Sequence, residues 1–351
     1  MQYMNLKPNN SNLKEAIDTA IARVLAHGHY VMGPELAQLE RALCDYVGVQ
    51  HCILTSNGTS ALGAALLAVG LQAGDEVITS PFSFFASAEV IALLGAKPVF
   101  VDIDADTYNI DPALIEQAIT PKTRAIMPIS LFGQPAAMQT INAIAARYQL
   151  PVIEDGAQSF GAYHHGQRSS NLSTIGCTSF FPSKPLGCYG DGGACFTNDG
   201  ELAAVMRSIV NHGQQERYIH GRLGFNGRLD SIQAAILIEK LRYFDQDLAD
   251  RHQLAAQYNE LLGPAMTLPT VLPHNSSSYA QYTIEVTNRA VVQAALSAQD
   301  IPTAVHYPLG LHQQPAITAL GYDYPAFPMA EAACARVLSL PFYPGMPAQD
   351  V

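Results

Sequence analysis

One lysine, Lys184, stands between a short apolar segment and a glycine-rich loop. The segment Thr178–Phe181 resembles a buried strand, Pro182 ends it, and four glycines follow between residues 187 and 193. Partial burial at a strand end would lower the pKa of the lysine and leave its amine free to act as a nucleophile. Lys184 is therefore a candidate for Schiff-base chemistry, although this segment alone fits an ordinary surface lysine beside a turn equally well.

A carboxylate pair, Glu154 and Asp155, ends a second apolar segment at Val152–Ile153. In a parallel sheet the carboxyl ends of the strands face the ligand crevice, so Asp155 is expected to project there. A carboxylate in that position can keep the pyridine nitrogen of pyridoxal phosphate (PLP) protonated, which makes the ring an electron sink. Taken alone, the pair fits a helix cap or a metal ligand better, and we interpret Glu154 as structural.

The segment Thr55–Leu62 joins a predicted strand to an Ala/Leu-rich helix. Gly58, Thr59 and Ser60 would then offer free N–H groups and hydroxyls at a helix N-terminus, where phosphate binds readily. Simple N-capping is the alternative. The spacing is not that of a P-loop, and no GxGxxG motif follows the strand, which disfavours a nucleotide cofactor. Together, a phosphate site, an acid and a lysine, each at a predicted strand end, indicate a PLP enzyme.

Short apolar segments alternate with helical ones, which predicts βαβ units and a mostly parallel sheet. Strands are expected at residues 51–55, 76–79, 98–101, 125–129, 152–153, 177–181, 194–197 and 282–286. Helices are expected at 12–26, 87–94, 137–148 and 290–299. A further helix is expected to follow Gly33–Pro34, another to end at Leu67, and a long one to run from Ser231 to Leu262. We place a domain boundary within that long helix, and a looser αβ segment opens at Gly263–Pro264.

The composition narrows the class of protein. The 351 residues are 48% hydrophobic and 14% charged, and the net charge of −11 argues against a basic nucleic-acid-binding face. Six scattered cysteines without a CxxC pair indicate a reducing compartment without disulfides. No signal peptide is recognisable at the N-terminus, and no apolar run approaches the roughly 20 residues needed to span a bilayer. We therefore expect a cytoplasmic protein that acts away from membranes.

Several longer motifs resemble those of the PLP-dependent nucleotide-sugar aminotransferases of the DegT/StrS type. They are His27–Glu35 (HGHYVMGPE), Asn57–Thr59, Glu154–Gln158 (EDGAQ), Ser183–Lys184 and Gly224–Asp230 (GFNGRLD). The resemblance implies the fold-type I aminotransferase fold and a homodimer whose active sites are shared between subunits. With the boundary placed within the long helix, we expect a large PLP-binding domain over residues 1–240 and a smaller C-terminal αβ domain over 241–351.

The same resemblance assigns roles to individual residues. It implies that Lys184 bears the cofactor and moves protons, and that Asp155 faces the pyridine nitrogen. Gln158 would lie near the cofactor hydroxyl and Phe84 would stack on the ring, although core packing is the simpler reading of this phenylalanine. Hydroxyls and amides would hold the phosphate, namely those of Thr59, Ser60, Ser179 and, from the neighbouring subunit, Asn226.

The segment Ser179–Ala194 looks most like the subgroup that aminates UDP-2-acetamido-2-deoxy-3-keto-glucuronate with glutamate as donor, for bacterial surface polysaccharides. In that subgroup, a segment similar to His306–Tyr307–Pro308 with His312 contacts the substrate from the partner subunit. Arg228 would bind a carboxylate or phosphate, or else form an interface salt bridge.

Three alternatives stay open. They are a 4-aminotransferase acting on a UDP- or dTDP-4-keto-6-deoxy sugar, a PLP-binding regulator that has lost catalysis, and an oxidoreductase that does not use PLP. No metal site is expected, because His164–His165, His212 and His220 lack metal-ligand spacing and are interpreted as surface or loop residues.

Overall fold

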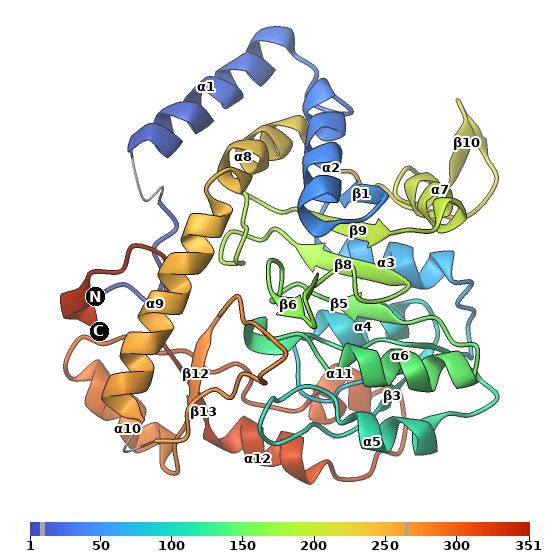
Figure 1. Cartoon of the computed structure of the whole chain (residues 1–351). Helices are drawn as coiled ribbons and strands as arrows, with labels where there is room; N and C mark the ends of the chain where they lie inside the picture. Colours follow the sequence, from blue (N-terminus) through green and yellow to red (C-terminus); the bar gives the residue numbers. More distant parts are fainter. Residues whose placement is uncertain (8–10, 264–265) are drawn as a thin grey trace.

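The computed structural model describes residues 1–7, 11–263 and 266–351 of the chain (Figure 1). Its α-helices are α1 (Ser11–His27), α2 (Pro34–Val47), α3 (Gly58–Ala68), α4 (Ala86–Leu93), α5 (Pro112–Ile115), α6 (Met138–Arg147), α7 (Gly200–Ile209), α8 (Ser231–Leu241), α9 (Phe244–Leu262), α10 (Arg289–Ser297), α11 (Pro315–Thr318) and α12 (Pro328–Arg336). Its strands are β1 (His51–Thr55), β2 (Glu76–Thr79), β3 (Lys97–Phe100), β4 (Thr123–Ile126), β5 (Ile153–Asp155), β6 (Tyr163–His164), β7 (Gln167–Arg168), β8 (Ile175–Ser179), β9 (Gly193–Thr197), β10 (Gln214–Glu216), β11 (Ile219–His220), β12 (Tyr282–Glu285) and β13 (Val337–Leu340).

Two groups of strands, β3-β2-β4 and β5-β8-β9-β1, make the central sheet. Isolated parallel bridges from Ile126 to Val152 and from Ile129 to Asp155 connect the groups. The order across the sheet is therefore β3-β2-β4-β5-β8-β9-β1, and β9 alone among these strands runs antiparallel to its neighbours. This confirms the predicted α/β fold with a mostly parallel mixed sheet.

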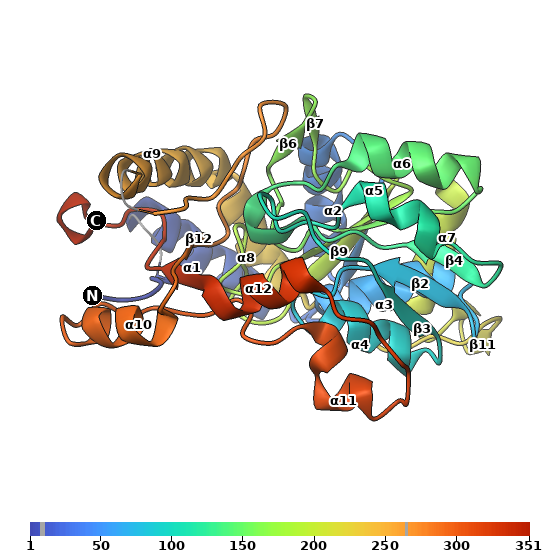
Figure 2. The same cartoon turned by 90° about the horizontal axis from the view of Figure 1, so that it is seen from below.

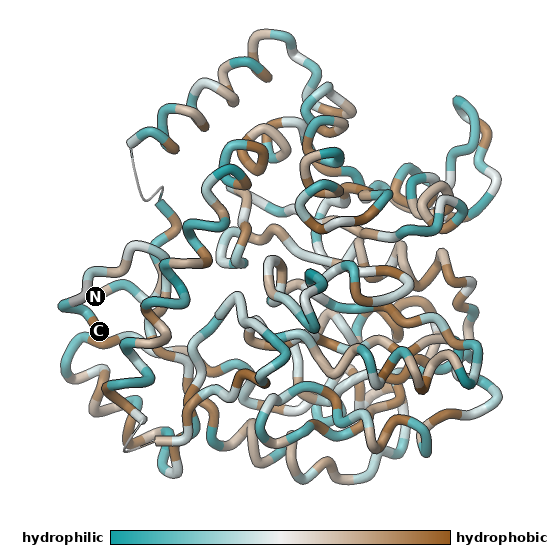
Figure 3. Tube along the Cα trace, in the orientation of Figure 1, coloured by the Kyte–Doolittle hydropathy of each residue, from teal (hydrophilic) through white to brown (hydrophobic). Residues whose placement is uncertain are grey.

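Apolar layers cover both faces of this sheet. On one face, α3 is buried along most of its length, and α7 adds Ala203, Met206 and Ile209 to the same core. On the opposite face, the stripe of α2 packs with the buried side of α8. This stripe consists of Leu36, Leu39, Leu43 and Val47, all of which are buried. Figure 3 shows hydrophilic and hydrophobic residues alternating along α1, which buries only the side that faces α8.

The predicted long helix after Ser231 is in fact two helices, α8 and α9, with Arg242 and Tyr243 between them. The first buried residues of α9, Phe244 and Leu248, still pack in the core that receives α8, and the packing partner changes only further along α9. Helix α8 packs under α1 and α2, whereas Leu254 and Tyr258 of α9 pack against the β12–β13 pair. No glycine or proline marks the break, so the sequence pattern runs on through it. The predicted opening of the next segment at Gly263–Pro264 falls partly outside the described residues.

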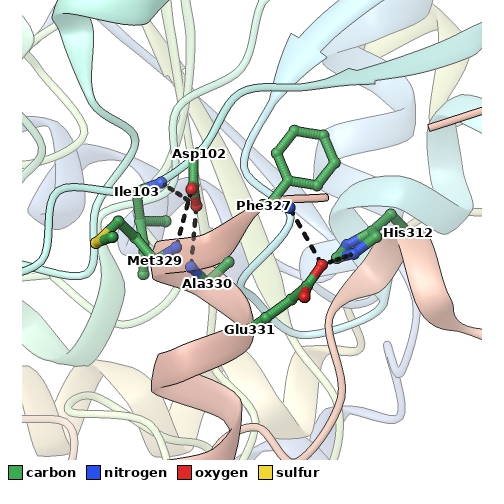
Figure 4. Close-up of polar contacts among 7 residues, drawn as sticks. All are labelled: Asp102, Ile103, His312, Phe327, Met329, Ala330 and Glu331. Atoms are coloured by element: carbon green, nitrogen blue, oxygen red, sulfur yellow. Dashed lines mark hydrogen bonds and ion pairs between the residues drawn. The ribbon is translucent and has the colours of Figure 1, made fainter. Parts of the chain in front are cut away.

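The C-terminal part contains the antiparallel pair β12–β13 together with α10, α11 and α12 (Figure 2). Asp102, which follows β3, forms hydrogen bonds that connect helix α12 to the central sheet. The Asp102 carboxylate accepts the N–H groups of Met329 and Ala330 at 3.0 and 2.9 Å, in the first turn of α12 (Figure 4). The N-terminal residues also lie against this part, because the N–H of Phe342 donates to the carbonyl of Tyr3 at 3.3 Å.

Candidate active site

A cavity of about 680 Å³ lies at the carboxyl ends of the central strands. Its wall includes the residues that follow β1, β2, β5 and β8, and it also receives residues from the C-terminal part. Ten residues that line it matter to the site: Thr59, Ser60, Phe84, Asp155, Gln158, Ser179, Lys184, Gln281, His306 and Tyr307. The three sequence features that indicated PLP therefore meet in one place.

Lys184 lies half-buried in the loop after β8. Its backbone N–H donates to the carbonyl of Phe181 at 2.8 Å, which turns the chain back toward the cavity. Gly187 permits this turn, because a Cβ there would come within 2.5 Å of the carbonyl of Pro182. Burial lowers the pKa of Lys184, and the charge of Asp155 offsets this in part. The lowered pKa increases the share of neutral amine, which is the nucleophilic form.

Asp155 ends β5 and reaches the cavity, whereas its neighbour Glu154 points to the other side. One oxygen of Asp155 accepts the N–H of Ala157 at 3.1 Å. Burial raises the pKa of Asp155, and the Ala157 N–H and then Lys184 act against that rise. Glu154 is fully buried and accepts the hydroxyls of Ser130 and Ser169 and the N–H of Ser170, all at 2.7–2.8 Å. The interpretation of Glu154 as a structural residue agrees with these contacts.

The N-terminus of α3 forms one end of the cavity. The Asn57 side chain accepts the N–H of Ser60 at 2.8 Å and so caps the helix, while Gly58 and Thr59 line the cavity. A Cβ on Gly58 would lie 2.8 Å from the Cβ of Ser179, so the end of β8 packs directly on the start of α3. Uncapped backbone N–H groups and hydroxyls thus face one spot, as an anion site requires.

Gln158 and Phe84 occupy two further parts of the wall. The Gln158 side chain accepts the N–H of Phe132 at 2.8 Å and donates to the hydroxyl of Tyr307 at 3.2 Å. Phe84 is 57% exposed, and its ring lies 6.3 Å from that of Tyr307. Core packing is therefore the wrong reading of Phe84, which is an aromatic wall of an open cavity.

His306 and Tyr307 reach the cavity from the same chain, which corrects the expectation that this segment comes from the partner subunit. The Nδ1 of His306 lies 2.9 Å from the hydroxyl of Ser339, which in turn contacts the hydroxyl of Thr283. His312 does not accompany them. It is buried beneath α12 and pairs with Glu331 at 3.1 Å, so its expected role in the substrate segment is wrong for this chain (Figure 4).

Asn226 and Arg228 lie outside this cavity. Asn226 is exposed, and Arg228 donates to the side chain of Asn211 at 2.6 Å. Arg228 lines a separate hollow that also contains Glu40 and Arg207. Within one chain, the structure does not bring either residue to Lys184.

Sequence reasoning missed Gln281, which precedes β12 and lines the cavity. Its buried side-chain oxygen has no hydrogen-bond partner among the described residues. No motif or strand-end position distinguishes this glutamine in the sequence, so only the folded chain reveals it. His164 was likewise misjudged as a surface residue, because it is 4% exposed and lies beside His165 and His274.

These residues fit PLP. One cavity on a mostly parallel sheet contains a half-buried lysine with a lowered pKa and a helix N-terminus. It also contains a carboxylate with one oxygen that forms no hydrogen bond among the described residues. The fold and site together define a fold-type I PLP-dependent enzyme. The model of the DegT/DnrJ/EryC1/StrS aminotransferase family matches residues 11–351, and the chain belongs to that family. It is thus a PLP-dependent aminotransferase of nucleotide sugars.

Individual relatives extend over nearly the whole chain. The UDP-2-acetamido-2-deoxy-3-oxo-D-glucuronate aminotransferase of Pseudomonas aeruginosa is 53% identical over 345 residues, which are 98% of this chain and 95% of that protein. A pleiotropic regulatory protein of Geobacillus stearothermophilus is 44% identical over 345 residues, 97% of this chain and 93% of that one. The solved structure of ntda from Bacillus subtilis with bound cofactor PMP has a TM-score of 0.90 and 33% identity, and the match covers 97% of this chain and 80% of that one.

Among the described residues, no helix is long and apolar enough to cross a membrane.

Proposed function

We propose that this enzyme transfers an amino group from glutamate to the 3-keto carbon of UDP-2-acetamido-2-deoxy-3-keto-glucuronate, on a route to bacterial surface polysaccharides. The observation that carries the proposal is the 53% identity with the Pseudomonas aeruginosa aminotransferase of that substrate, sustained over nearly the full length of both chains. The cavity supports it, because a volume of about 680 Å³ accommodates a cofactor together with part of a substrate.

When bound, PLP supplies an electron-withdrawing ring that stabilises negative charge on the carbon that loses a proton. We assign the proton transfer to Lys184 Nζ. It accepts a proton from the α-carbon of the amino donor in the first half-reaction and returns one to the sugar carbon in the second. Asp155 holds the ring nitrogen in its protonated state, and Gln158 and Phe84 fix the orientation of the ring.

The remaining assignments concern anions. The N–H groups of Gly58 and Thr59 and the hydroxyls of Thr59, Ser60 and Ser179 would hold the cofactor phosphate without adding net positive charge, while the N–H of Ser60 stays with the Asn57 cap. His306 and Tyr307 contact the sugar, and Arg228 binds a carboxylate or phosphate of the substrate through its planar guanidinium.

We also infer a homodimer with shared active sites. Asn226 and Arg228 belong to a motif typical of the family, yet both lie away from the cavity of their own chain. Exposed apolar side chains in the His27–Glu35 motif and directly before the Gly224–Asp230 motif support an interface, namely those of Tyr30, Val31, Met32 and Leu223. In this dimer Asn226 and Arg228 complete the site of the partner.

The domain division at residues 240/241 remains a proposal, supported by the break between α8 and α9. A cytoplasmic location is proposed from the six cysteines, all of which are free thiols.

Half-reactions test the substrate. Purified holoenzyme is mixed with glutamate, and the near-visible band of the lysine-bound cofactor is expected to disappear as 2-oxoglutarate forms. The aminated enzyme then receives 3-keto and 4-keto UDP-sugars separately. Return of the band with the 3-keto uronate alone supports the proposal, whereas return with a 4-keto-6-deoxy sugar overturns the substrate and retains the chemistry. Absence of any response to glutamate would leave a PLP-binding regulator as the better account.

A further inference from the structure

Three histidines form a cluster away from the active-site cavity. His164 ends β6, His165 follows it at the tip of the β6–β7 hairpin, and His274 comes from the segment between α9 and β12. One ligand nitrogen from each ring lies within 4.8 Å of the other two, and no other such group occurs among the described residues. We propose that this cluster is a transition-metal site that takes Zn²⁺ or a similar imidazole-binding cation.

The backbone holds the two segments together before any ion binds. The N–H of His165 donates to the carbonyl of His274 at 2.8 Å, and the N–H of Ser276 donates to the carbonyl of Tyr163 at 2.9 Å. The side chain of Ser276 accepts the N–H of Tyr163 at 2.8 Å in return. The hairpin and this segment lie side by side in both views (Figure 1, Figure 2). The three rings are therefore brought together by main-chain contacts that do not depend on the histidine side chains.

Asn275 orients the buried member of the cluster. Its side-chain N–H₂ donates to the Gln134 side chain and to the carbonyl of Pro135, both at 3.0 Å. The oxygen of the same amide must then face His164 Nδ1, which lies 2.6 Å away. Because an amide oxygen can only accept a hydrogen bond, Nδ1 carries the proton. Such an acceptor behind a ligating histidine fixes the tautomer and the direction of the ring in metal sites.

The lone pair of His164 Nε2 is consequently available. It accepts only the backbone N–H of Gln139 at 3.3 Å, longer than the usual 2.9–3.0 Å. Gln139 lies at the surface, and we expect water to replace the histidine as partner of that N–H when an ion binds. A metal ion can thus take over Nε2 without leaving a buried donor unpaired.

The other two rings are exposed and free to adjust. His165 and His274 stack with centroids 4.4 Å apart and an interplanar angle of 8°. Two nitrogens on one tetrahedral Zn²⁺ lie about 3.4 Å apart, given Zn–N bonds of about 2.0–2.1 Å. Rotation about χ2, which is a soft torsion in histidine, brings the lone pairs of the stacked rings to a common point. With three protein ligands and an exposed outer side, the fourth position is left to water.

Calorimetric titration of the holoenzyme with Zn²⁺ tests the site. The wild-type chain is expected to bind one equivalent, and His165→Gln and His274→Gln are each expected to weaken binding by about 10-fold or more. His29→Asn is the matched control, because His29 and His27 also form a close ring pair, at 5.4 Å, but lack a third histidine. This variant is expected to bind Zn²⁺ as the wild type does.

A second measurement guards against loss of folding. Zn²⁺ is expected to raise the thermal unfolding midpoint of the wild type and of His29→Asn but not of His274→Gln, since an ion that binds only the folded state stabilises it. The cofactor absorbance reports whether each variant is intact. Equal Zn²⁺ affinity in the wild type and His274→Gln, or no binding by the wild type at millimolar Zn²⁺, overturns the proposal. Loss of binding in His29→Asn does the same, because it moves the ion to the other histidine pair.

Discussion

At the scale of the residue, the two adjacent carboxylates at the end of β5 have opposite tasks because strand side chains alternate between faces. Asp155 faces the cavity, and Glu154 faces a cluster of hydroxyl and N–H donors from Ser130, Ser169 and Ser170. The sequence shows that the two carboxylates are adjacent, but it could not show which of them would find hydrogen-bond donors inside the protein. The contacts of Glu154 settle that question.

The pair makes a matched test. Asp155→Asn is expected to reduce kcat by about 100-fold or more, because the amide cannot stabilise a protonated ring nitrogen. Glu154→Gln is expected to lower the free energy of unfolding by about 1–3 kcal/mol, since its NH₂ would face donors, and to change kcat little. Steady-state kinetics and chemical denaturation of both variants check this, and the reverse ranking in kcat would mean that the wrong carboxylate was assigned.

His306 predicts a pH dependence of stability. Burial, aided by the charge of Lys184, lowers the pKa of this histidine to about 4, whereas an unfolded histidine titrates near 6.5. Because the folded pKa is the lower one, its contribution is complete above about pH 6.5 and is lost as the pH falls toward 4. His306→Gln is expected to reduce that loss by up to about 3 kcal/mol in denaturation series across this range. The same slope in the wild type and in His306→Gln would refute the assignment.

At the scale of the element, helix ends and strand ends do most of the positioning. The cap of α3 by Asn57 and the close packing of Gly58 on Ser179 place the predicted phosphate site at the end of β8. Strands β1 and β2 begin and end where the pattern predicts, because continuous apolar segments bounded by polar residues determine them. The break between α8 and α9 was missed, since no glycine or proline marks it and Phe244 and Leu248 on its far side still pack in the core that receives α8.

The cap of α12 is a test at this scale. Asp102 accepts N–H groups of Ile103, Met329 and Ala330, all at 2.9–3.0 Å, and is 8% exposed (Figure 4). Asp102→Ala is expected to lower the free energy of unfolding by about 1–3 kcal/mol. Asp111→Ala, which removes an exposed cap of the short helix α5, is the control and is expected to cost less than about 1 kcal/mol. Equal losses in a denaturation experiment would show that burial of the cap does not matter.

At the scale of the whole molecule, long-range contacts decided what the sequence could not. The pattern predicted the mostly parallel sheet, and it predicted that Lys184, Asp155 and the start of α3 would lie at one edge of it. It could not show that His306 returns to the cavity of its own chain, nor that His274 lies beside His164, 110 positions earlier. Both depend on how the C-terminal part folds back on the sheet, and local periodicity contains no information about that packing.

The proposed sharing of active sites between subunits predicts complementation between inactive subunits. Lys184→Ala and Arg228→Ala are each expected to abolish turnover as pure dimers. When the two are mixed and allowed to exchange, half of the dimers are mixed and hold one intact site, so activity is expected to approach about a quarter of the wild-type value. Labelled subunits are used to confirm the exchange. If exchange occurs and the mixture is no more active than the separate variants, Arg228 does not belong to a shared site.

The most direct test of the account concerns Lys184 itself. Holoenzyme is reduced with borohydride, digested, and analysed by mass spectrometry to locate the covalently fixed cofactor. The account predicts the added mass on the peptide that contains Lys184 and nowhere else among the lysines. Cofactor on a different lysine, or an enzyme that turns over glutamate with no cofactor fixed by reduction, would contradict it.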